Sequence, residues 1–174
     1  MYNPRYIIHK EVYRMKLTFK SILALLFVIL LSGCVHQPSV GHDGVLSALQ
    51  KYDPQLKREH FVSSAVDLND DECQDAVVLM NRKSRYCGKR GCVMLVLLCQ
   101  EGELAPIAKT THVNPVVSTS RNKTLGLKNI DVVVYPEGES PHQVSLHYNG
   151  KSYPMSALFG YKIEKRTLER VLFK

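Results

Sequence analysis

The stretch DAVVLMNRKSRYCGKRGCVMLVLLC, residues 75–99, decides the fold that this sequence predicts. It begins with the apolar run Asp75 to Met80 and ends with a second apolar run, Cys92 to Leu98. A polar segment that contains Gly88 and Gly91 separates the two runs. Apolar runs of this length on either side of a glycine-containing polar segment are typical of antiparallel strands joined by a turn. We therefore predict a β-hairpin here.

The N-terminal part of the chain has the features of a bacterial secretory signal. Ile22 to Leu31 is an uncharged apolar run of ten residues, preceded by Lys16 and Lys20. The run is shorter than the roughly 20 residues of a membrane-spanning helix, but it fits the apolar core of a signal peptide. The sequence Leu-Ser-Gly-Cys that ends at Cys34 resembles the lipobox of bacterial lipoproteins. The resemblance implies thioether diacylglyceryl transfer to Cys34, cleavage before it, and acylation of the new N-terminus.

The same resemblance implies a location and a domain organisation. Val35 stands where an aspartate would retain a lipoprotein at the inner membrane, so we expect a lipid-anchored outer-membrane protein that faces the periplasm. We predict a signal peptide over residues 1–33, a lipidated tether over residues 34–42 and one β-rich periplasmic domain over residues 43–174. A signal peptide that starts at Met15 has a more ordinary length than one that starts at Met1. Residues 1–14 are therefore either part of a long signal peptide or a segment before the true start.

The net charge of the chain belongs largely to this signal. The whole chain has 23 Lys and Arg against 16 Asp and Glu, a formal charge of +7. Residues 1–33 hold five of these cations and one acid, which leaves 18 against 15 from Cys34 onward, or +3. Nucleic-acid binding usually requires a stronger, clustered basic surface. We therefore do not expect nucleic acid as a partner. The expected partners are the membrane, which the lipid anchor contacts, and an envelope protein or an anionic glycan.

Four cysteines follow the lipobox, and an exported domain meets an oxidising compartment in which they form disulfides. Four cysteines allow three pairings. In the predicted hairpin, Cys87 and Cys92 lie close together at the loop end, and Cys73 and Cys99 lie opposite each other at the base. We therefore expect the disulfides Cys87–Cys92 and Cys73–Cys99.

The remaining sequence adds one helix and several strands. Asp43 can cap a short helix through about Tyr52. Asn149-Gly150 predicts a type I′ hairpin between His142–Tyr148 and Lys151–Tyr153. The other expected elements are strands at His60–Leu68, Leu104–Ala108 and Ile130–Tyr135, strand ends and loop over Val113–Leu127, and a tail, Tyr161–Phe173, that fits either a helix or a strand. The expected fold is α+β and mainly β: a disulfide-stapled antiparallel sheet or small open barrel with a short N-terminal helix.

An acidic segment before the hairpin has the spacing of a calcium loop, in which oxygen ligands recur at every second residue. Glu72 occupies the position where such a loop needs glycine, and Val78 the position where it needs a bidentate glutamate. We therefore expect an acidic turn between two strands and no resident cofactor, with calcium as the alternative. Its ligands would be Asp67, Asn69, Asp71 and Asp75.

Three motifs in order resemble a group of uncharacterised Gram-negative periplasmic proteins and lipoproteins. They are DLNDDECQDAVVLM (Asp67–Met80), YCGKRGC (Tyr86–Cys92) and NGKSYP (Asn149–Pro154). The group has an acidic turn of the form D-L-N-x-D and a disulfide loop of the form C-G-x-x-G-C. This sequence departs from the group by placing Asp70 and Glu72 where glycines are usual, and by a second pair of cysteines. The resemblance implies fold and location, and no activity.

Basic side chains gather in the predicted hairpin loop around Tyr86. Such a cluster can bind lipopolysaccharide phosphates, anionic peptidoglycan or an acidic partner. The alternative is a solvated loop that charge keeps soluble. The residues of this predicted anionic-partner patch are Arg82, Lys83, Arg85, Lys89 and Arg90.

The sequence shows no recognisable catalytic set, because no nucleophile and base can be paired from it. We therefore expect a protein that is not an enzyme and that has a binding or structural role in the envelope. Two alternatives are an inhibitor of a wall-degrading enzyme and a thiol-disulfide exchange protein. The spacing from Cys87 to Cys92 is not that of a C-x-x-C redox motif.

Overall fold

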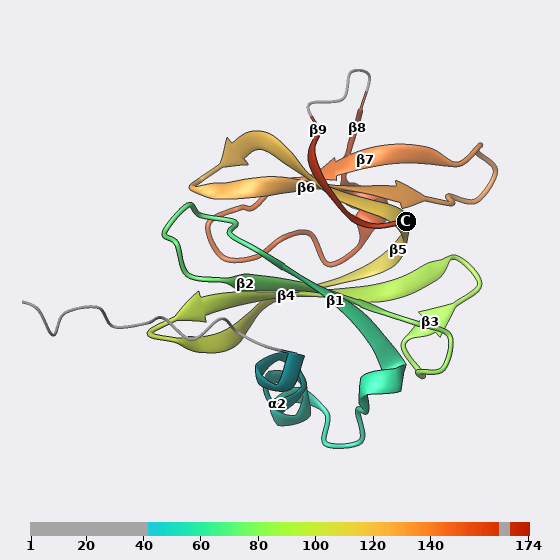
Figure 1. Cartoon of the computed structure of the whole chain (residues 1–174). Coiled ribbons are helices and arrows are strands. Elements are labelled where there is room, and N and C mark those ends of the chain that lie inside the picture. The colour runs from blue at the N-terminus through green and yellow to red at the C-terminus, as the bar shows by residue number, and fades with distance from the viewer. Residues whose placement is uncertain (1–41, 164–167) are drawn as a thin grey trace, which may run out of the picture. The chain divides into compact units, whose positions relative to one another are not determined.

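The structure is a computed structural model that describes residues 42–163 and 168–174 (Figure 1). These residues belong to one compact unit, Pro38–Lys174. The predicted signal peptide, Cys34 and nearly all of the tether lie outside the described residues. No helix among those described is long and apolar enough to cross a membrane.

The described residues form one helix, two short 3-10 helices and nine strands in an antiparallel sheet. The helices are α2 (His42–Tyr52), η1 (Arg58–His60) and η2 (Ala157–Phe159). The strands are β1 (Phe61–Val66), β2 (Asp75–Met80), β3 (Cys87–Gly88), β4 (Gly91–Gln100), β5 (Glu103–Thr124), β6 (Leu127–Val134), β7 (His142–Leu146), β8 (Tyr161–Lys162) and β9 (Leu168–Phe173).

The predicted hairpin is confirmed at the centre of the fold. β2 pairs with β4 so that Val77 lies opposite Val96 and Val78 opposite Leu95. All six residues of β2 are buried, because the strand has packed side chains on both faces. The short strand β3 pairs with the beginning of β4 at the tip of the hairpin. A strand buried on both faces has a continuous apolar sequence rather than an alternating one, which explains the two apolar runs.

The 22-residue strand β5 connects the two halves of the sheet. Its first part pairs with β4, and its second part pairs with β6 on one side and β9 on the other. The prediction of strand ends and loop over Val113–Leu127 is therefore wrong. Ser118, Thr119 and Ser120 are polar but fully buried, with their backbone paired to neighbouring strands. Polarity alone predicted a loop here, whereas strand pairing on both sides satisfies the backbone.

The strand order is β1-β2-β4-β5-β6-β7-β8, and the sheet is open rather than a closed barrel. The expected mainly antiparallel fold with one helix and two disulfides is therefore confirmed. In the tail, the strand interpretation is correct, because β8 pairs with β7 and β9 pairs with β5.

Two apolar cores hold the domain together. One face of β2 and β4 contributes side chains such as Val77 and Met94 to a core shared with β6 and β7. The other face contributes Val78 and Leu95 to a core shared with α2, whose Leu49 is fully buried. In Figure 1, α2 accordingly lies on the side of β2 and β4 that faces away from β6 and β7.

The hairpin predicted around Asn149-Gly150 is wrong in its second strand. The turn forms, since the Asn149 side chain accepts hydrogen bonds from the backbone N–H groups of Lys151 and Ser152. The following chain then leaves the sheet, and β7 pairs with β8 instead. Tyr153 provides the reason: it is 1% exposed and packs in the core that β2 and β4 share with β6 and β7. The buried tyrosine thus prevents Lys151–Tyr153 from pairing as a strand.

Candidate functional site

A disulfide closes the tip of the hairpin that β3 and β4 form. Cys87 lies directly opposite Cys92, and their sulfurs are bonded as the sequence predicted. The turn between the two strands consists of Lys89 and Arg90, whose side chains are exposed. The hairpin therefore presents two cations on a covalently closed turn.

Gly91 brings this tip against strand β5. Its φ of +130° lies in a region that side chains rarely adopt. A Cβ atom here would lie 2.8 Å from the carbonyl oxygen of Val113 and from Nδ2 of Asn114. Asn114 Nδ2 also donates a hydrogen bond of 3.0 Å to the carbonyl oxygen of Arg90. Glycine is thus required for the approach that joins the tip to β5.

A β-bulge in β5 faces the same tip. Thr111 and His112 together lie opposite the single residue Val93 of β4. His112 has a φ of +62°, which is uncommon outside glycine. Bulges bend a strand and redirect its side chains, and they are frequent beside functional sites. Both bulge residues line the pocket described next.

An open pocket of about 590 Å³, which we call the tip pocket, lies between the hairpin tip and the bulge of β5. The described residues that line it include four Lys and Arg side chains and no Asp or Glu. A concave surface with one sign of charge concentrates ions of the opposite sign. The arrangement therefore favours an anionic ligand. Its four cations are Arg85, Lys89, Arg90 and Lys109.

Two tyrosine rings support two of these cations. Lys109 Nζ lies 5.5 Å from the ring centroid of Tyr52 and 5.8 Å from that of Tyr86. The Arg85 guanidinium carbon lies 5.5 Å from the centroid of Tyr86. Cations at these distances are attracted to the electron-rich ring faces. The rings thus hold Arg85 and Lys109 at the pocket before any ligand is present.

Asp53, one residue after α2, fixes Arg85 and Tyr86 in place. Its Oδ2 accepts hydrogen bonds of 2.8 Å from Arg85 Nη2 and from the Tyr86 hydroxyl. Its Oδ1 accepts from the backbone N–H of Gln55 at 3.1 Å. The hydrogen bond from Gln55, followed by that from Tyr86, lowers the pKa of Asp53 below its ordinary value, and the Arg85 charge adds to this. The buried carboxylate is therefore ionised and orients one wall of the pocket.

The structure brings together part of the predicted basic patch. Arg85, Lys89 and Arg90 line the tip pocket, whereas Lys83 borders a smaller pocket beside Asp53. Arg82 is exposed and lines neither pocket.

Sequence reasoning missed Lys109 and His112, which strand pairing brings to the tip from about 20 residues further along the chain. The Glu101-Gly102 turn between β4 and β5 was the available signal. Counting along a hairpin closed by that turn places Lys109 close to Leu95.

A serine and a histidine also meet beside the pocket. His112 Nδ1 lies 3.0 Å from Ser156 Oγ and 3.1 Å from Thr111 Oγ1. Ser156 is 9% exposed, and its Oγ accepts the backbone N–H of Leu158 as the N-cap of η2. Ser156 does not line the tip pocket. The contact therefore connects the bulge of β5 to η2.

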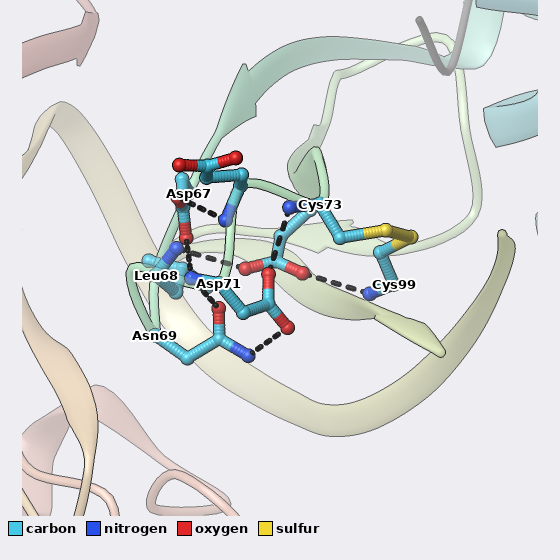
Figure 2. Close-up of a disulfide and its surroundings, with 8 residues drawn as sticks. Asp67, Leu68, Asn69, Asp71, Cys73 and Cys99 are labelled. Atoms are coloured by element: carbon cyan, nitrogen blue, oxygen red, sulfur yellow. Dashed lines mark hydrogen bonds between the residues drawn. A yellow bond between two sulfur atoms is a disulfide. The ribbon is translucent and has the colours of Figure 1, made fainter. Parts of the chain in front are cut away.

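The predicted acidic turn forms between β1 and β2, and the side-chain oxygens of Asp67, Asn69 and Asp71 face other groups of the turn (Figure 2). Asp67 accepts hydrogen bonds from the backbone N–H groups of Asp70, Asp71 and Glu72. Asp71 accepts from the backbone N–H of Cys73 at 2.8 Å and from the Asn69 side chain at 2.7 Å. These carboxylates thus satisfy the backbone donors of the turn.

Asp75 is the fully buried member of this group, and it joins the turn to β4. One carboxylate oxygen accepts the backbone N–H of Leu68 at 2.8 Å, and the other accepts that of Cys99 at 2.7 Å. Burial raises the pKa of Asp75 to about 6, although both hydrogen bonds oppose the shift. The disulfide Cys73–Cys99 fastens the turn at the same place, as the sequence predicted (Figure 2).

Asp70, in the same turn, pairs with two lysines. Its carboxylate lies 2.6 Å from Lys123 Nζ and 2.9 Å from Lys128 Nζ. The hydrogen bonds from Lys123 and then Lys128 lower the pKa of Asp70. Within residues 42–163 and 168–174, no three His, Cys, Asp or Glu side chains are arranged to hold a metal ion. Calcium binding stays a prediction that this geometry leaves untested.

All four cysteines among the described residues are in disulfides, so thiol exchange would require prior reduction. Comparison of the chain with protein-family models, curated proteins and solved structures gives no match.

Proposed function

We propose that the protein is an acylated envelope protein, anchored at Cys34, whose periplasmic domain binds an anionic envelope component through the tip pocket. The binding role needs no catalysis. The observation that carries the proposal is the gathering of Arg85, Lys89, Arg90 and Lys109 around one pocket whose described lining has no acid. Phosphate and carboxylate groups are the anions that such cations bind through charge-assisted hydrogen bonds.

Charge compensation around the pocket leaves it cationic. Asp53 pairs with Arg85, and Glu137 pairs with Arg90 at 3.3 Å. The second pair is exposed on both sides, and such pairs contribute little. Among the described residues, no acid is paired with Lys89 or Lys109 within 4.0 Å. At least two cations are thus available to a ligand.

The test is the binding of the purified protein to lipopolysaccharide micelles, which carry phosphate groups, against neutral dodecyl maltoside micelles. The double substitution Lys89→Gln/Arg90→Gln is expected to weaken binding about tenfold, which corresponds to about 1.4 kcal/mol. Added salt is expected to weaken the binding of the unaltered protein, because the charges are solvent-accessible.

The matched control is Arg121→Gln/Lys162→Gln, which removes the same charge from exposed positions outside the tip pocket. We expect this control to bind within about twofold of the unaltered protein, since distant surface charges are screened. Equal losses in the two double variants would mean that net charge, and not the tip pocket, governs binding. No binding in any variant would remove the proposal.

Asp53 separates positioning from simple charge. If the pocket acts only through its electrostatic potential, Asp53→Asn removes a nearby negative charge and strengthens anion binding. If Asp53 acts by holding Arg85 and Tyr86 with its 2.8 Å hydrogen bonds, the same substitution weakens binding. We expect the weaker binding, measured in the same titration, together with a reduced difference between the affinities for phosphate and sulfate probes.

A further inference from the structure

A second open pocket, which we call the apolar pocket, adjoins the tip pocket and is also about 590 Å³ in volume. It lies where the end of α2 meets β5. Tyr52 and Met155 are its exposed large side chains, 40% and 77% accessible respectively. Lys109 is the one charged residue among the described residues that line it. The apolar pocket thus presents apolar surface directly beside the cationic tip pocket.

The two pockets meet at Lys109 and Thr111, which line both of them. Lys109 has its ammonium group near the rings of Tyr52 and Tyr86 at this border. Long cationic side chains commonly lay their methylene groups on apolar surface and keep the charge at its edge. The border residue is therefore suited to contact a ligand at the junction of its charged and apolar parts.

The cationic tip pocket and the apolar pocket together favour some classes of anionic ligand over others. An inorganic anion would fill only the tip pocket and leave the apolar pocket empty. An acidic peptide or a glycan acid offers no continuous apolar segment for the second pocket. A lipid with a phosphate headgroup offers both parts, and a phosphate monoester carries nearly two negative charges at neutral pH, which suits several cations better than one carboxylate does.

We propose that the joined pockets bind one phosphate-bearing lipid, with its phosphate in the tip pocket and the first part of its acyl chain in the apolar pocket. The inference rests on the proposed function and deepens it by naming the ligand class. Lys109 is the residue expected to contact the phosphate at the border of the two pockets. Exposed apolar surface rimmed by polar residues often marks a ligand-binding groove or a membrane contact.

The experiment uses the full chain in phosphatidylcholine nanodiscs and titration calorimetry. The probes are dihexanoyl phosphatidic acid below its micelle concentration, dihexanoyl phosphatidylcholine and inorganic phosphate. We expect phosphatidic acid to bind at least about tenfold more tightly than either other probe, because only it can occupy both pockets. Lys109→Gln is expected to weaken its binding about tenfold.

Met155→Glu tests the apolar pocket separately. The side chain is 77% exposed, so the substitution leaves the cores intact. We expect about a tenfold loss of phosphatidic acid affinity and a smaller loss for inorganic phosphate, because the new carboxylate repels both anions but only the lipid uses the apolar pocket. Leu125→Glu is the matched control, because Leu125 is 70% exposed and lines neither pocket. The control is expected to bind phosphatidic acid as the unaltered protein does.

The outcomes distinguish this inference from the function on which it rests. Equal affinity for phosphatidic acid and inorganic phosphate, with Met155→Glu without effect, would overturn the lipid inference and leave anion binding at the tip pocket standing. Binding of a hexaglutamate peptide in place of phosphatidic acid would overturn it as well. Failure of every anionic probe to bind, lipopolysaccharide included, would remove both proposals.

Discussion

The buried carboxylate of Asp75 is expected to make the stability of the domain depend on pH. Its pKa is about 6 in the folded protein, against 3.8 for the same group in water. The folded state therefore binds the Asp75 proton more tightly than the unfolded state does. The stabilisation from this group is complete below the unfolded pKa and is lost as the pH rises through the folded pKa.

The magnitude follows from the two pKa values. Between about pH 5 and about pH 7.5, the free energy of unfolding should fall by about 1.4 kcal/mol on account of Asp75 alone. The full pKa difference corresponds to about 3 kcal/mol. Asp53 and Asp70 do not enter this window, because their pKa values are lowered and their contributions change at lower pH.

The assay is urea unfolding followed by circular dichroism at several pH values, for the unaltered protein and for Asp75→Asn. The asparagine removes the titrating group while keeping the shape, so the difference between the two curves isolates the contribution of Asp75. The variant should be less stable at every pH, by about 1–3 kcal/mol, because an amide NH₂ replaces one of two oxygens that accept buried N–H groups. Parallel pH dependence in the two proteins would refute the reasoning.

Three further predictions concern the tip and the cores. Gly91→Ala should lower the free energy of unfolding by about 2 kcal/mol or more and weaken anion binding, because the φ is +130° and a Cβ would collide with β5. Urea unfolding measures the first effect and the micelle titration the second. Unchanged binding would argue against the contact between the tip and β5. Tyr153→Phe should cost about 1–2 kcal/mol in urea unfolding, because the buried hydroxyl donates a 2.6 Å hydrogen bond to the Lys128 carbonyl; a neutral result would mean that water replaces the donor. Replacing Cys73 and Cys99 by serine opens a loop with a sequence separation of 26 and should lower the free energy of unfolding by about 3 kcal/mol. The same change at the tip disulfide, whose separation is 5, should lower it less. The reverse order of thermal stability in the two variants would contradict this.

The sequence predicted the local, strongly patterned parts of the fold. The apolar runs of β2 and β4 and their glycine-containing connection indicated the hairpin, and the hairpin geometry then indicated both disulfides. The patterns failed where distant contacts decide the structure. Ser118 and Thr119 have polar side chains, yet two neighbouring strands pair with their backbone.

The same limit applies to the candidate site. Lys89 and Arg90 were predicted because they lie in the hairpin turn, next to each other in sequence. Lys109 reaches the site through the register of β4 with β5, and Asp53 reaches it from the end of α2. Neither position shows a local signal, because a lone lysine in a strand and an aspartate before a proline are ordinary features. The hairpin tip could be predicted from local sequence, and the pocket only from the tertiary structure.

The proposed function depends on acylation at Cys34, which would give the protein an envelope location and thereby access to anionic lipids and glycans. The most direct measurement is mass spectrometry of the N-terminal peptide of the protein isolated from bacterial membranes. We expect Cys34 to be the first residue and to carry a diacylglyceryl thioether and an amide-linked acyl chain. A free thiol at Cys34, with Ile22–Leu31 still attached before it, would contradict the account.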